Sequence, residues 1–347
     1  MARRSEDPTA KRSDSGAELF ERVAGPLQLV EHALREPLAS PAGLVSQLGE
    51  HVLSAGGKRL RPALLLLAAE LCGYTGARRI HMGAAVELLH TATLLHDDVV
   101  DVSDLRRGLP SANAVWGNRR AVLAGDFFYA RASSMVIEDG NPDILASFAR
   151  TILLMAEGEL LQLERSFDSA VTETHYYQVI ERKSASLLAT ACEVGAILGG
   201  VTRSETRSLA EFGTQLGLAF QLRDDALDYE AGEKALGKVP YADLSEGKVT
   251  MPLLLTLKRC TSSERERIGR VIKTTVRSAE SSGETSDETG QRLAVADLVS
   301  LYRGVEDTVA RARLHAERAC NAIEAFPDGP ARRSLHEAAD YAVSRGR

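Results

Sequence analysis

Residues 88–102, which read LLHTATLLHDDVVDV, carry the pattern that decides the fold. Apolar residues recur here at spacings of four, three, four and three: Leu88, Ala92, Leu95, Val99 and Val102. This period predicts an amphipathic helix with one continuous apolar face. His90, Asp97 and Asp101 lie on the opposite face. The stretch therefore predicts a core helix that presents carboxylates on its polar side.

The same helical period dominates from residue 17 to the end of the chain. No run alternates apolar and polar residues as a half-buried strand would. We therefore predict an all-α fold, with one domain of ten or more helices over residues 17–347 around a central cavity. Residues 1–16 are charged and polar, so we expect a disordered tail there. Residues 278–290, SAESSGETSDETG, are predicted to form a flexible loop.

The composition is that of a soluble globular protein, with 44% apolar and 26% charged residues. The net charge is −6 and no basic stripe interleaves with aromatic residues, so nucleic acid is not expected as a partner. The longest apolar run, residues 63–69, is far shorter than the roughly 18 residues of a membrane span. Four widely spaced cysteines and a polar N-terminal segment predict reduced thiols and a cytoplasmic location.

Asp97, Asp98 and Asp101 occupy positions i, i+1 and i+4, so one helical turn gathers three carboxylates. A single triplet of this kind could be an ordinary solvated acidic face. This one directly follows an apolar stretch, and Arg106 and Arg107 come a few residues later. That context favours a functional cluster.

The same spacing recurs in a second triplet: Asp224, Asp225 and Asp228. It lies on a helix predicted to begin near Glu211, and Gly213, Gly217 and Gln221 continue the stripe that leads to it. Glycine inside a helix costs about 1 kcal/mol relative to alanine. Two glycines one turn apart therefore indicate that something needs room beside them, either a ligand or a neighbouring helix.

Paired carboxylate clusters suggest a metal. Mg²⁺ typically takes one or two carboxylates together with phosphate oxygens of a substrate. Two opposed clusters can therefore hold a diphosphate through bridging ions, and the metal makes that diphosphate a leaving group. The two triplets predict a Mg²⁺-dependent enzyme that acts on a diphosphate.

Residues 56–62, GGKRLRP, place two glycines and three cations just before a predicted helix. Glycine-rich turns at helix starts bind anions through backbone amides, and lysine and arginine add charge. Alone, the segment could be a turn with solvated charges. Beside the Asp clusters it predicts a second diphosphate pocket lined by Lys58, Arg61 and Arg107. Three single lysines are further candidates for neutralising phosphate: Lys183, Lys238 and Lys248.

Six segments complete the pattern: GGKRLRP, LLHDDVVDVSDLRRG, GNRRAVLAGDFFYARA, ERKSASLL, GLAFQLRDDALDYE and GKVPYADLSEGKVTMPLLL. In this order, over residues 51–255, they resemble the signatures of the trans-type (E-)isoprenyl diphosphate synthases, or polyprenyl synthetases. The remaining helices resemble the C-terminus of long-chain members such as the octaprenyl diphosphate synthases. The resemblance implies the isoprenoid synthase fold, a homodimer, and about three Mg²⁺ ions per active site.

The resemblance also implies roles for the matching residues. Isopentenyl diphosphate would be bound by Lys58, Arg61 and Arg107, with His90 in the family's polar position. Mg²⁺ around an allylic diphosphate would be held by Asp97, Asp101, Asp224 and Asp228. The predicted catalytic set also includes Asp98, Asp225 and Lys183. The allylic diphosphate would be contacted by Arg106, Lys183, Gln221, Lys238 and Lys248. Ser184 stands where most members carry threonine and retains the hydroxyl, and Gln162 is a weaker candidate for the allylic site.

The implied reaction is ionisation of the allylic diphosphate, attack by the isopentenyl double bond, and loss of a proton to the departing pyrophosphate. In this family, product length depends on three positions before the first cluster: Leu89, Ala92 and Thr93. None is aromatic, and Gly213 and Gly217 would leave space on the opposite wall. We therefore predict a long all-trans product, about C40 within a range of C30 to C50, that is handed to a membrane.

Other functions use similar residues. A farnesyl or geranylgeranyl diphosphate synthase would make a shorter chain with the same motifs. A terpene cyclase would keep an Asp-rich motif but would need no isopentenyl site. A non-catalytic subunit of a heteromeric synthase usually loses one Asp cluster. The GGKRLRP segment and the two intact clusters favour elongation.

Overall fold

The computed structural model describes residues 17–54, 56–106, 108–232, 241–279 and 286–346. The first half of the described chain forms α1 (Ala17–Arg22), α2 (Ala24–Arg35), η1 (Glu36–Leu38), α3 (Gly43–Ser54), α4 (Leu60–Leu71), α5 (Arg78–Val100), α6 (Ala112–Trp116), α7 (Asn118–Asp139) and α8 (Pro142–Glu164). The second half forms α9 (Glu173–Ile180), η2 (Glu181–Ala185), α10 (Ser186–Gly199), α11 (Arg203–Gly232), α12 (Ala242–Ser245), α13 (Met251–Arg259), α14 (Ser262–Ala279), α15 (Ser286–Leu301), α16 (Gly304–Ala322) and α17 (Pro330–Ser344).

The prediction of an all-α fold with ten or more helices is confirmed. In the described ranges, the strands are limited to one antiparallel hairpin, whose two strands, β1 (Leu105–Arg106) and β2 (Leu109–Pro110), have two residues each. Among these same residues, no helix combines the length and apolar character that crossing a membrane requires.

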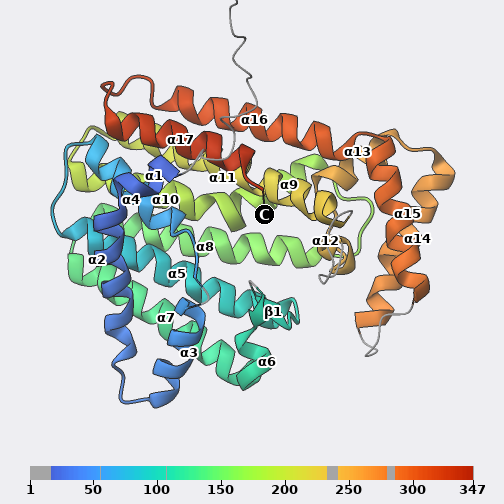
Figure 1. Ribbon diagram of the computed structural model, residues 1–347, viewed down its shortest axis with the longest axis horizontal. Coiled ribbons are helices and arrows are strands. Elements are labelled where there is room, and N and C mark those ends of the chain that lie inside the picture. The colour runs from blue at the N-terminus through green and yellow to red at the C-terminus, as the bar shows by residue number, and fades with distance from the viewer. Residues whose placement is uncertain (1–16, 55, 107, 233–240, 280–285, 347) are drawn as a thin grey trace, which may run out of the picture.

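The long helix α11 runs through the middle of the bundle and packs between α10 and α16 (Figure 1). Helix α5 packs against α4 and α7, while α8 packs against α10. Helices α14 and α15 form a pair at one end of the molecule (Figure 1). Helix α10 contacts both helices that carry the Asp clusters, α5 and α11.

Two clusters of buried apolar side chains stabilise this arrangement. The larger is built mainly on α4, α5, α7 and α10, with Leu88 and Phe128 fully buried. The second joins α9, α11, α13, α14 and α15 around residues such as Leu222 and Ile272. Burying each such side chain stabilises the fold by about 1.5–3 kcal/mol.

Helix α11 begins earlier than predicted. Its first residue is Arg203, not a position near Glu211, because Thr202 and Glu205 form a capping box. The Thr202 amide donates to the Glu205 carboxylate (2.8 Å), and the Glu205 amide donates to the Thr202 hydroxyl (3.3 Å). Helix α11 is therefore long enough to reach from the outer end of the bundle to the second Asp cluster.

Helix α5 confirms most of the apolar stripe that opened the sequence pattern. Leu88, Ala92 and Leu95 are buried, but the helix ends at Val100 and Asp101 is its C-cap. Val102 was predicted to continue the stripe, and this is wrong: it has φ of 51° and is 76% exposed. The chain has left the helix at this point, so the helical period no longer applies.

Gly213 and Gly217 do not face a ligand space. A Cβ on Gly213 would lie 2.6 Å from the Ala189 Cα, and a Cβ on Gly217 would lie 2.5 Å from the Ala185 Cα. Both glycines let α11 approach the backbone of η2 and α10. The prediction that they widen a product tunnel is therefore wrong, and the helix–helix alternative is correct.

Parts of some predicted features lie outside the described residues. These parts are the tail at 1–16, Arg107, Lys238, and residues 280–285 of the predicted loop. The two ends of that loop, 278–279 and 286–290, are helical. Polar composition alone does not distinguish a solvated helix from a loop.

Candidate active site

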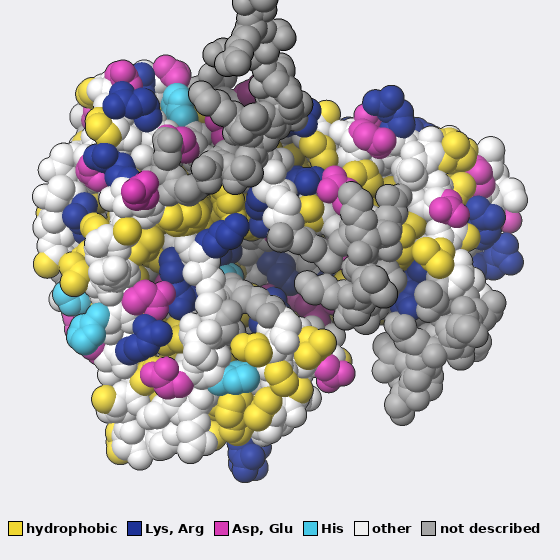
Figure 2. All heavy atoms as spheres, in the orientation of Figure 1, with side chains coloured by type: hydrophobic (Ala, Val, Ile, Leu, Met, Phe, Trp, Pro, Cys, Tyr) yellow, Lys and Arg dark blue, Asp and Glu magenta, His cyan; other side chains and the backbone are white. Residues whose placement is uncertain are grey.

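A cavity of about 230 Å³ opens between α5, α8, α9 and α11. Four carboxylates line it: Asp97, Asp101, Asp225 and Asp243. The other predicted residues that line it are Arg106, Gln162, Lys183, Ser184, Gln221 and Lys248. Figure 2 shows the hollow near the centre of this face, with cationic side chains around it. The fold therefore brings the two Asp clusters and most of the allylic-site candidates to one place.

The first cluster sends two carboxylates into the cavity. Asp97 and Asp101 are one turn apart on the last turn of α5, as the sequence predicted. Asp98 is only 3% exposed and does not line this cavity. It accepts a hydrogen bond from Arg106 Nε at 2.8 Å and forms an ion pair with the same guanidinium. Asp98 thus orients Arg106, whose side chain reaches the cavity.

The second cluster sends one carboxylate into the cavity. Asp225 accepts hydrogen bonds from the Tyr176 hydroxyl and, at 2.9 Å, from Gln221 Nε2. Asp224 is paired with Arg345 instead. Asp228 accepts the backbone N–H groups of Ala242 and Asp243, each at 3.2 Å, and so holds the start of α12. This contact places Asp243 at the cavity wall.

Negative charge in the cavity is incompletely balanced. Burial raises the pKa of Asp97 to about 6, with the carboxylates Glu159 and Asp101 adding to the shift and Lys183 opposing it. Burial also raises the pKa of Asp225 to about 6, despite the hydrogen bonds from Tyr176 and Gln221. The pKa of Asp243 is held well above its usual range by burial and by Asp228 and Asp225. Raised carboxylate pKa values mark a site that would gain from a bound cation.

The donor set is suited to a hard divalent metal, because all four carboxylates supply oxygen ligands. Within the described residues, no three His, Cys, Asp or Glu side chains gather closely enough to hold a metal ion. A metal bound here would complete its coordination with oxygens from a ligand or water. This arrangement fits Mg²⁺, which usually keeps ligands of that kind.

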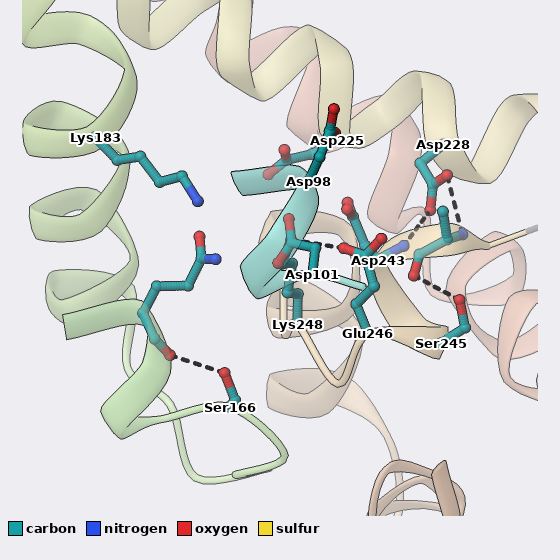
Figure 3. A network of polar contacts seen from close by, with 12 residues as sticks. Asp98, Asp101, Ser166, Lys183, Asp225, Asp228, Asp243, Ser245, Glu246 and Lys248 are labelled. Carbon is teal, nitrogen blue, oxygen red and sulfur yellow. Dashed lines mark hydrogen bonds and ion pairs between the residues drawn. The ribbon is translucent and has the colours of Figure 1, made fainter. Parts of the chain in front are cut away.

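Lys183 faces the carboxylates from the opposite side of the cavity, and Lys248 lies beside Asp101 (Figure 3). Lys183 pairs with Glu159 of α8, and Lys248 donates to Asp101 at 3.1 Å and to Glu246 at 2.6 Å. Burial lowers the pKa of Lys248, but Glu246 and Asp101 more than offset this and the pKa is raised overall. Lys248 therefore stays charged.

Ser184 and Gln221 are also connected. The Ser184 hydroxyl donates to Gln221 Oε1 at 2.8 Å, and the amide nitrogen of Gln221 in turn donates to Asp225. A chain of hydrogen bonds thus links η2 to the second Asp cluster. The Ser184 hydroxyl thus lies one residue away from the Asp225 carboxylate in this chain of hydrogen bonds.

The basic segment 56–62 does not line the acidic cavity. Lys58 Nζ donates to the Tyr341 hydroxyl on α17 and lies 4.6 Å from the centroid of that ring. Arg59 has φ of 49° and turns inward, where it pairs with Glu31 and, at 2.9 Å, with buried Glu87. Arg61 and His90 are likewise absent from the cavity wall. A second pocket here remains a prediction.

The residues predicted to set chain length lie before Asp97 on α5. Leu89 and Ala92 are buried, and the Thr93 hydroxyl donates to the His90 carbonyl within the helix. None of the three lines the cavity described above. Their role in product length stays a prediction.

Several residues at the site were missed by reasoning from the sequence. Asp243, Glu246, Glu159 and Tyr176 are isolated polar or aromatic residues without a repeated spacing. Asp243 and Glu246 do lie inside the GKVPYADLSEGKVT segment, so that segment held a signal beyond its lysines. Tyr176 and Glu159 had no local signal.

Comparison with known proteins agrees with this geometry. The polyprenyl synthetase family model matches residues 43–286. The octaprenyl diphosphate synthase of Escherichia coli (strain K12) is 40% identical over 92% of this chain and 95% of its own length. The all-trans-nonaprenyl-diphosphate synthase (geranyl-diphosphate specific) of Rhodobacter capsulatus is 38% identical over 96% of this chain and 98% of its own length.

A solved structure shares the whole fold. It is the polyprenyl synthase from Caulobacter crescentus CB15, complexed with calcium and isoprenyl diphosphate. It has a TM-score of 0.88 and 37% identity, and the match covers 100% of both chains.

The fold and these comparisons define an all-α prenyltransferase. The chain belongs to the polyprenyl synthetase family, and the activity that follows is that of a trans-prenyl diphosphate synthase. The length of the product does not follow, because octaprenyl and nonaprenyl synthases are similar to this chain at nearly equal identity.

Proposed function

We propose that this protein condenses isopentenyl diphosphate repeatedly with an allylic diphosphate, in 1'-4 trans fashion, to give a long all-trans polyprenyl diphosphate of about C40. The observation that carries the proposal is the cavity in which Asp97 and Asp101 face Asp225, with Lys183 and Lys248 beside them. Carboxylates and ammonium groups arranged around one space suit a ligand that is a polyanion bound together with divalent cations.

Mg²⁺ is the proposed cofactor, with Asp97, Asp101, Asp224 and Asp228 as its ligands. Asp224 and Asp228 would exchange their present contacts, with Arg345 and with the start of α12, for the metal. When bound, it would supply Lewis-acid stabilisation of the leaving diphosphate. A solved relative supports a divalent ion, since the Caulobacter crescentus polyprenyl synthase was complexed with calcium and isoprenyl diphosphate. About three ions per site is our expectation from the family.

The chain's own residues bind and orient the allylic diphosphate. Lys183, Lys248 and Arg106 neutralise its oxygens, and Gln221 and Ser184 offer hydrogen bonds at its edge. Asp98 fixes the direction of Arg106. As the diphosphate leaves, these cations stabilise the charge that develops on it. Arg107 and Lys238, which lie outside the described residues, are proposed to add to the isopentenyl and allylic contacts.

Isopentenyl diphosphate is proposed to bind at Lys58 and Arg61, with His90 nearby. Two anionic substrates need two cationic pockets, and the basic segment 56–62 is separate from the carboxylate-lined cavity. The double bond of isopentenyl diphosphate attacks the allylic cation, and a proton then passes to the released pyrophosphate.

A long product is supported by the small or aliphatic residues Leu89, Ala92 and Thr93, where an aromatic ring would block chain growth. An enzyme that makes shorter farnesyl or geranylgeranyl chains is the alternative. Ala92→Phe should shorten the product by several isoprene units; an unchanged product length would show that Ala92 does not limit the chain.

The deciding experiment incubates purified protein with Mg²⁺, isopentenyl diphosphate and either farnesyl or geranylgeranyl diphosphate, and sizes the products. We expect successive addition products that end near C40. Isopentenyl diphosphate labelled with ¹⁴C must enter the product, which separates elongation from a terpene cyclase. No growth with any primer would overturn the proposal.

A homodimer is proposed as the working assembly. Exposed apolar side chains line α7 and α8: Leu123 is 58% exposed, Ile137 63%, Leu153 60% and Leu160 61%. An exposed apolar face of this kind usually marks an interface. Size-exclusion chromatography coupled to light scattering should give twice the mass of one chain, and the double variant L153K/L160K should give a monomer.

We also propose a cytoplasmic location and transfer of the apolar product to a membrane. The four cysteines, all free thiols here, are in keeping with a reducing compartment. Fractionation of cells that express the full chain tests the location directly.

A further inference from the structure

The helix that carries Lys183 and Ser184 contains an irregular turn. Helices α9, η2 and α10 follow one another without a break from Glu173 to Gly199, and η2, Glu181–Ala185, is a π-helical turn. A π turn inserts one residue and so rotates everything after it by about 100° relative to a regular helix. Such turns are often found at functional sites.

Neighbouring residues of this turn face opposite sides. Lys183 and Ser184 line the acidic cavity, whereas Glu181 and Arg182 line a separate cavity of about 260 Å³ between α8, α10 and α11. Before the turn, Tyr176 of α9 contacts Asp225. After it, α10 packs against α11 and α4. The inserted residue thus lets α9 face the cavity while α10 faces the core.

Helix α8 touches the turn at a glycine. A Cβ on Gly158 would lie 2.7 Å from the backbone nitrogen of Lys183 and 3.1 Å from its Cα. No side chain fits there unless the Lys183 backbone moves. The residues beside Gly158 pair with the same turn, Glu157 with Arg182 at 3.7 Å and Glu159 with Lys183.

Helix α11 touches the turn from another direction, also at a glycine. A Cβ on Gly217 would lie 2.5 Å from the Cα of Ala185 and 2.6 Å from its Cβ. The π turn is therefore held between two backbones that approach it closely. Such contacts between backbones leave little freedom, because closely packed groups cannot shift without steric overlap.

We propose that Gly158 and Gly217 are positioning residues, which clamp the π turn so that the Lys183 ammonium and the Ser184 hydroxyl meet the allylic diphosphate. The inference rests on the proposed function, in which this cavity binds that substrate. The two glycines would act selectively. Their substitution should weaken the affinity for the allylic substrate. It should leave the binding of isopentenyl diphosphate, at the separate segment 56–62, largely unchanged.

The test compares Gly158→Ala with Gly195→Ala in the full-length enzyme. Gly195 is a matched control, because a Cβ there would lie 2.7 Å from the Leu65 carbonyl oxygen, on the α4 side of α10 and away from the cavity. For Gly158→Ala we expect KM for the allylic diphosphate to rise about tenfold and kcat to fall, since displacements of about 1 Å have effects of this size. Gly195→Ala should lower Tm and leave both KM values unchanged.

KM for isopentenyl diphosphate separates positioning from general damage. It should change less than about threefold in Gly158→Ala. Equal changes in both KM values, or no change in the allylic KM of a folded variant, would overturn the inference. If Gly158→Ala does not fold, Gly217→Ala is judged by the same criterion, because it displaces the same turn from α11.

Lys183→Ala distinguishes failure of the inference from failure of the proposed function. If this variant keeps its allylic KM, Lys183 does not bind the substrate and the proposed function is wrong at this residue. If Lys183→Ala loses allylic affinity while both glycine variants keep it, the proposed function stands and only the clamp is refuted.

Discussion

The two Asp triplets share one spacing but have different surroundings. In the first, Asp97 and Asp101 enter the cavity and Asp98 is bound by a cation, Arg106. In the second, only Asp225 enters the cavity, and its hydrogen-bond donors, Tyr176 and Gln221, are neutral. Repetition of a motif in sequence therefore does not mean repetition of its role.

The cause lies in what packs beside each helix. Helix α5 ends within its triplet, so the hairpin of β1 and β2 can return Arg106 to Asp98. Helix α11 continues past its triplet, and α12 and Arg345 take up Asp228 and Asp224. Asp243 then serves as the second carboxylate on that side. The site has four cavity carboxylates, but only three come from the two motifs.

The largest expected effect tests whether carboxylates inside the cavity matter more than those outside it. Asp97→Asn should reduce kcat/KM by about a thousandfold, since loss of a metal ligand removes several kcal/mol of transition-state stabilisation. Asp224→Asn, in a carboxylate that is 43% exposed and paired with Arg345, should reduce it about tenfold. Steady-state kinetics at saturating Mg²⁺ measures both; equal losses would contradict the difference between the triplets.

The next effect concerns Asp243, which lies outside both motifs. Asp243→Asn should lower kcat/KM about a hundredfold, because it removes one of four cavity carboxylates. Glu230→Gln is a suitable control, since that carboxylate pairs with Arg223 rather than lining the cavity. If the Asp243 variant is as active as the Glu230 variant, Asp243 has no role in catalysis.

A smaller effect concerns how one carboxylate of each triplet changes the thermal stability of the protein. The pKa of Asp225 is about 6 in the folded protein, above the usual value, so the folded state binds a proton that the unfolded state has released between about pH 4 and pH 6. The free energy of unfolding should therefore fall as pH rises through this window. Asp225→Asn should raise Tm by a few degrees at pH 7.5 in the absence of metal and flatten this pH dependence.

Asp98→Asn is the counterpart. Burial raises the pKa of Asp98 as well, with the Arg106 guanidinium opposing the shift, so the same proton linkage acts on this carboxylate. The variant should nevertheless lower Tm above pH 5, because it also removes the ion pair and leaves Arg106 without its anion. Thermal unfolding followed by circular dichroism from pH 5 to pH 8 checks both variants. Stabilisation of the Asp98 variant at pH 7.5 would show that the two carboxylates are alike.

The smallest effect should come from Arg345. Its guanidinium pairs with Asp224 and lies 3.4 Å from the centre of the Phe220 ring. Arg345→Gln should change KM for Mg²⁺ less than about threefold, because a partly exposed ion pair contributes little. A titration of activity with Mg²⁺ measures this; a tenfold change would show that the ion pair between Arg345 and Asp224 contributes to metal binding.

Much of the fold was accessible from the sequence because it depends on local periodicity. The apolar spacing of Leu88, Ala92 and Leu95 is a property of one helix, and it predicted burial correctly. The end of that helix was not accessible, since Val102 fits the period and yet lies beyond the last turn. The role of Gly213 and Gly217 depended on which helix lies beside them, which no local pattern contains.

The site was predictable where its residues repeat a spacing or extend a motif, as with Asp97, Asp101 and Lys248. It was not predictable where a contact joins distant segments. Tyr176 reaches Asp225 across 49 residues, and Glu159 meets Lys183 only because α8 packs on η2. The direction of Asp98 toward Arg106, and of Arg59 toward the buried Glu87, likewise follows from tertiary packing.

The contact between Lys58 and Tyr341 has a consequence for synthesis of the protein. These residues are 283 positions apart, and Tyr341 lies on the last helix, α17. During translation, which proceeds from the N-terminus, the basic segment leaves the ribosome long before its aromatic partner exists. Lys58 can take its final position only after nearly the whole chain has emerged. A nascent or truncated chain that lacks α17 and the residues after it therefore lacks the aromatic partner of Lys58 and also Arg345, the partner of Asp224.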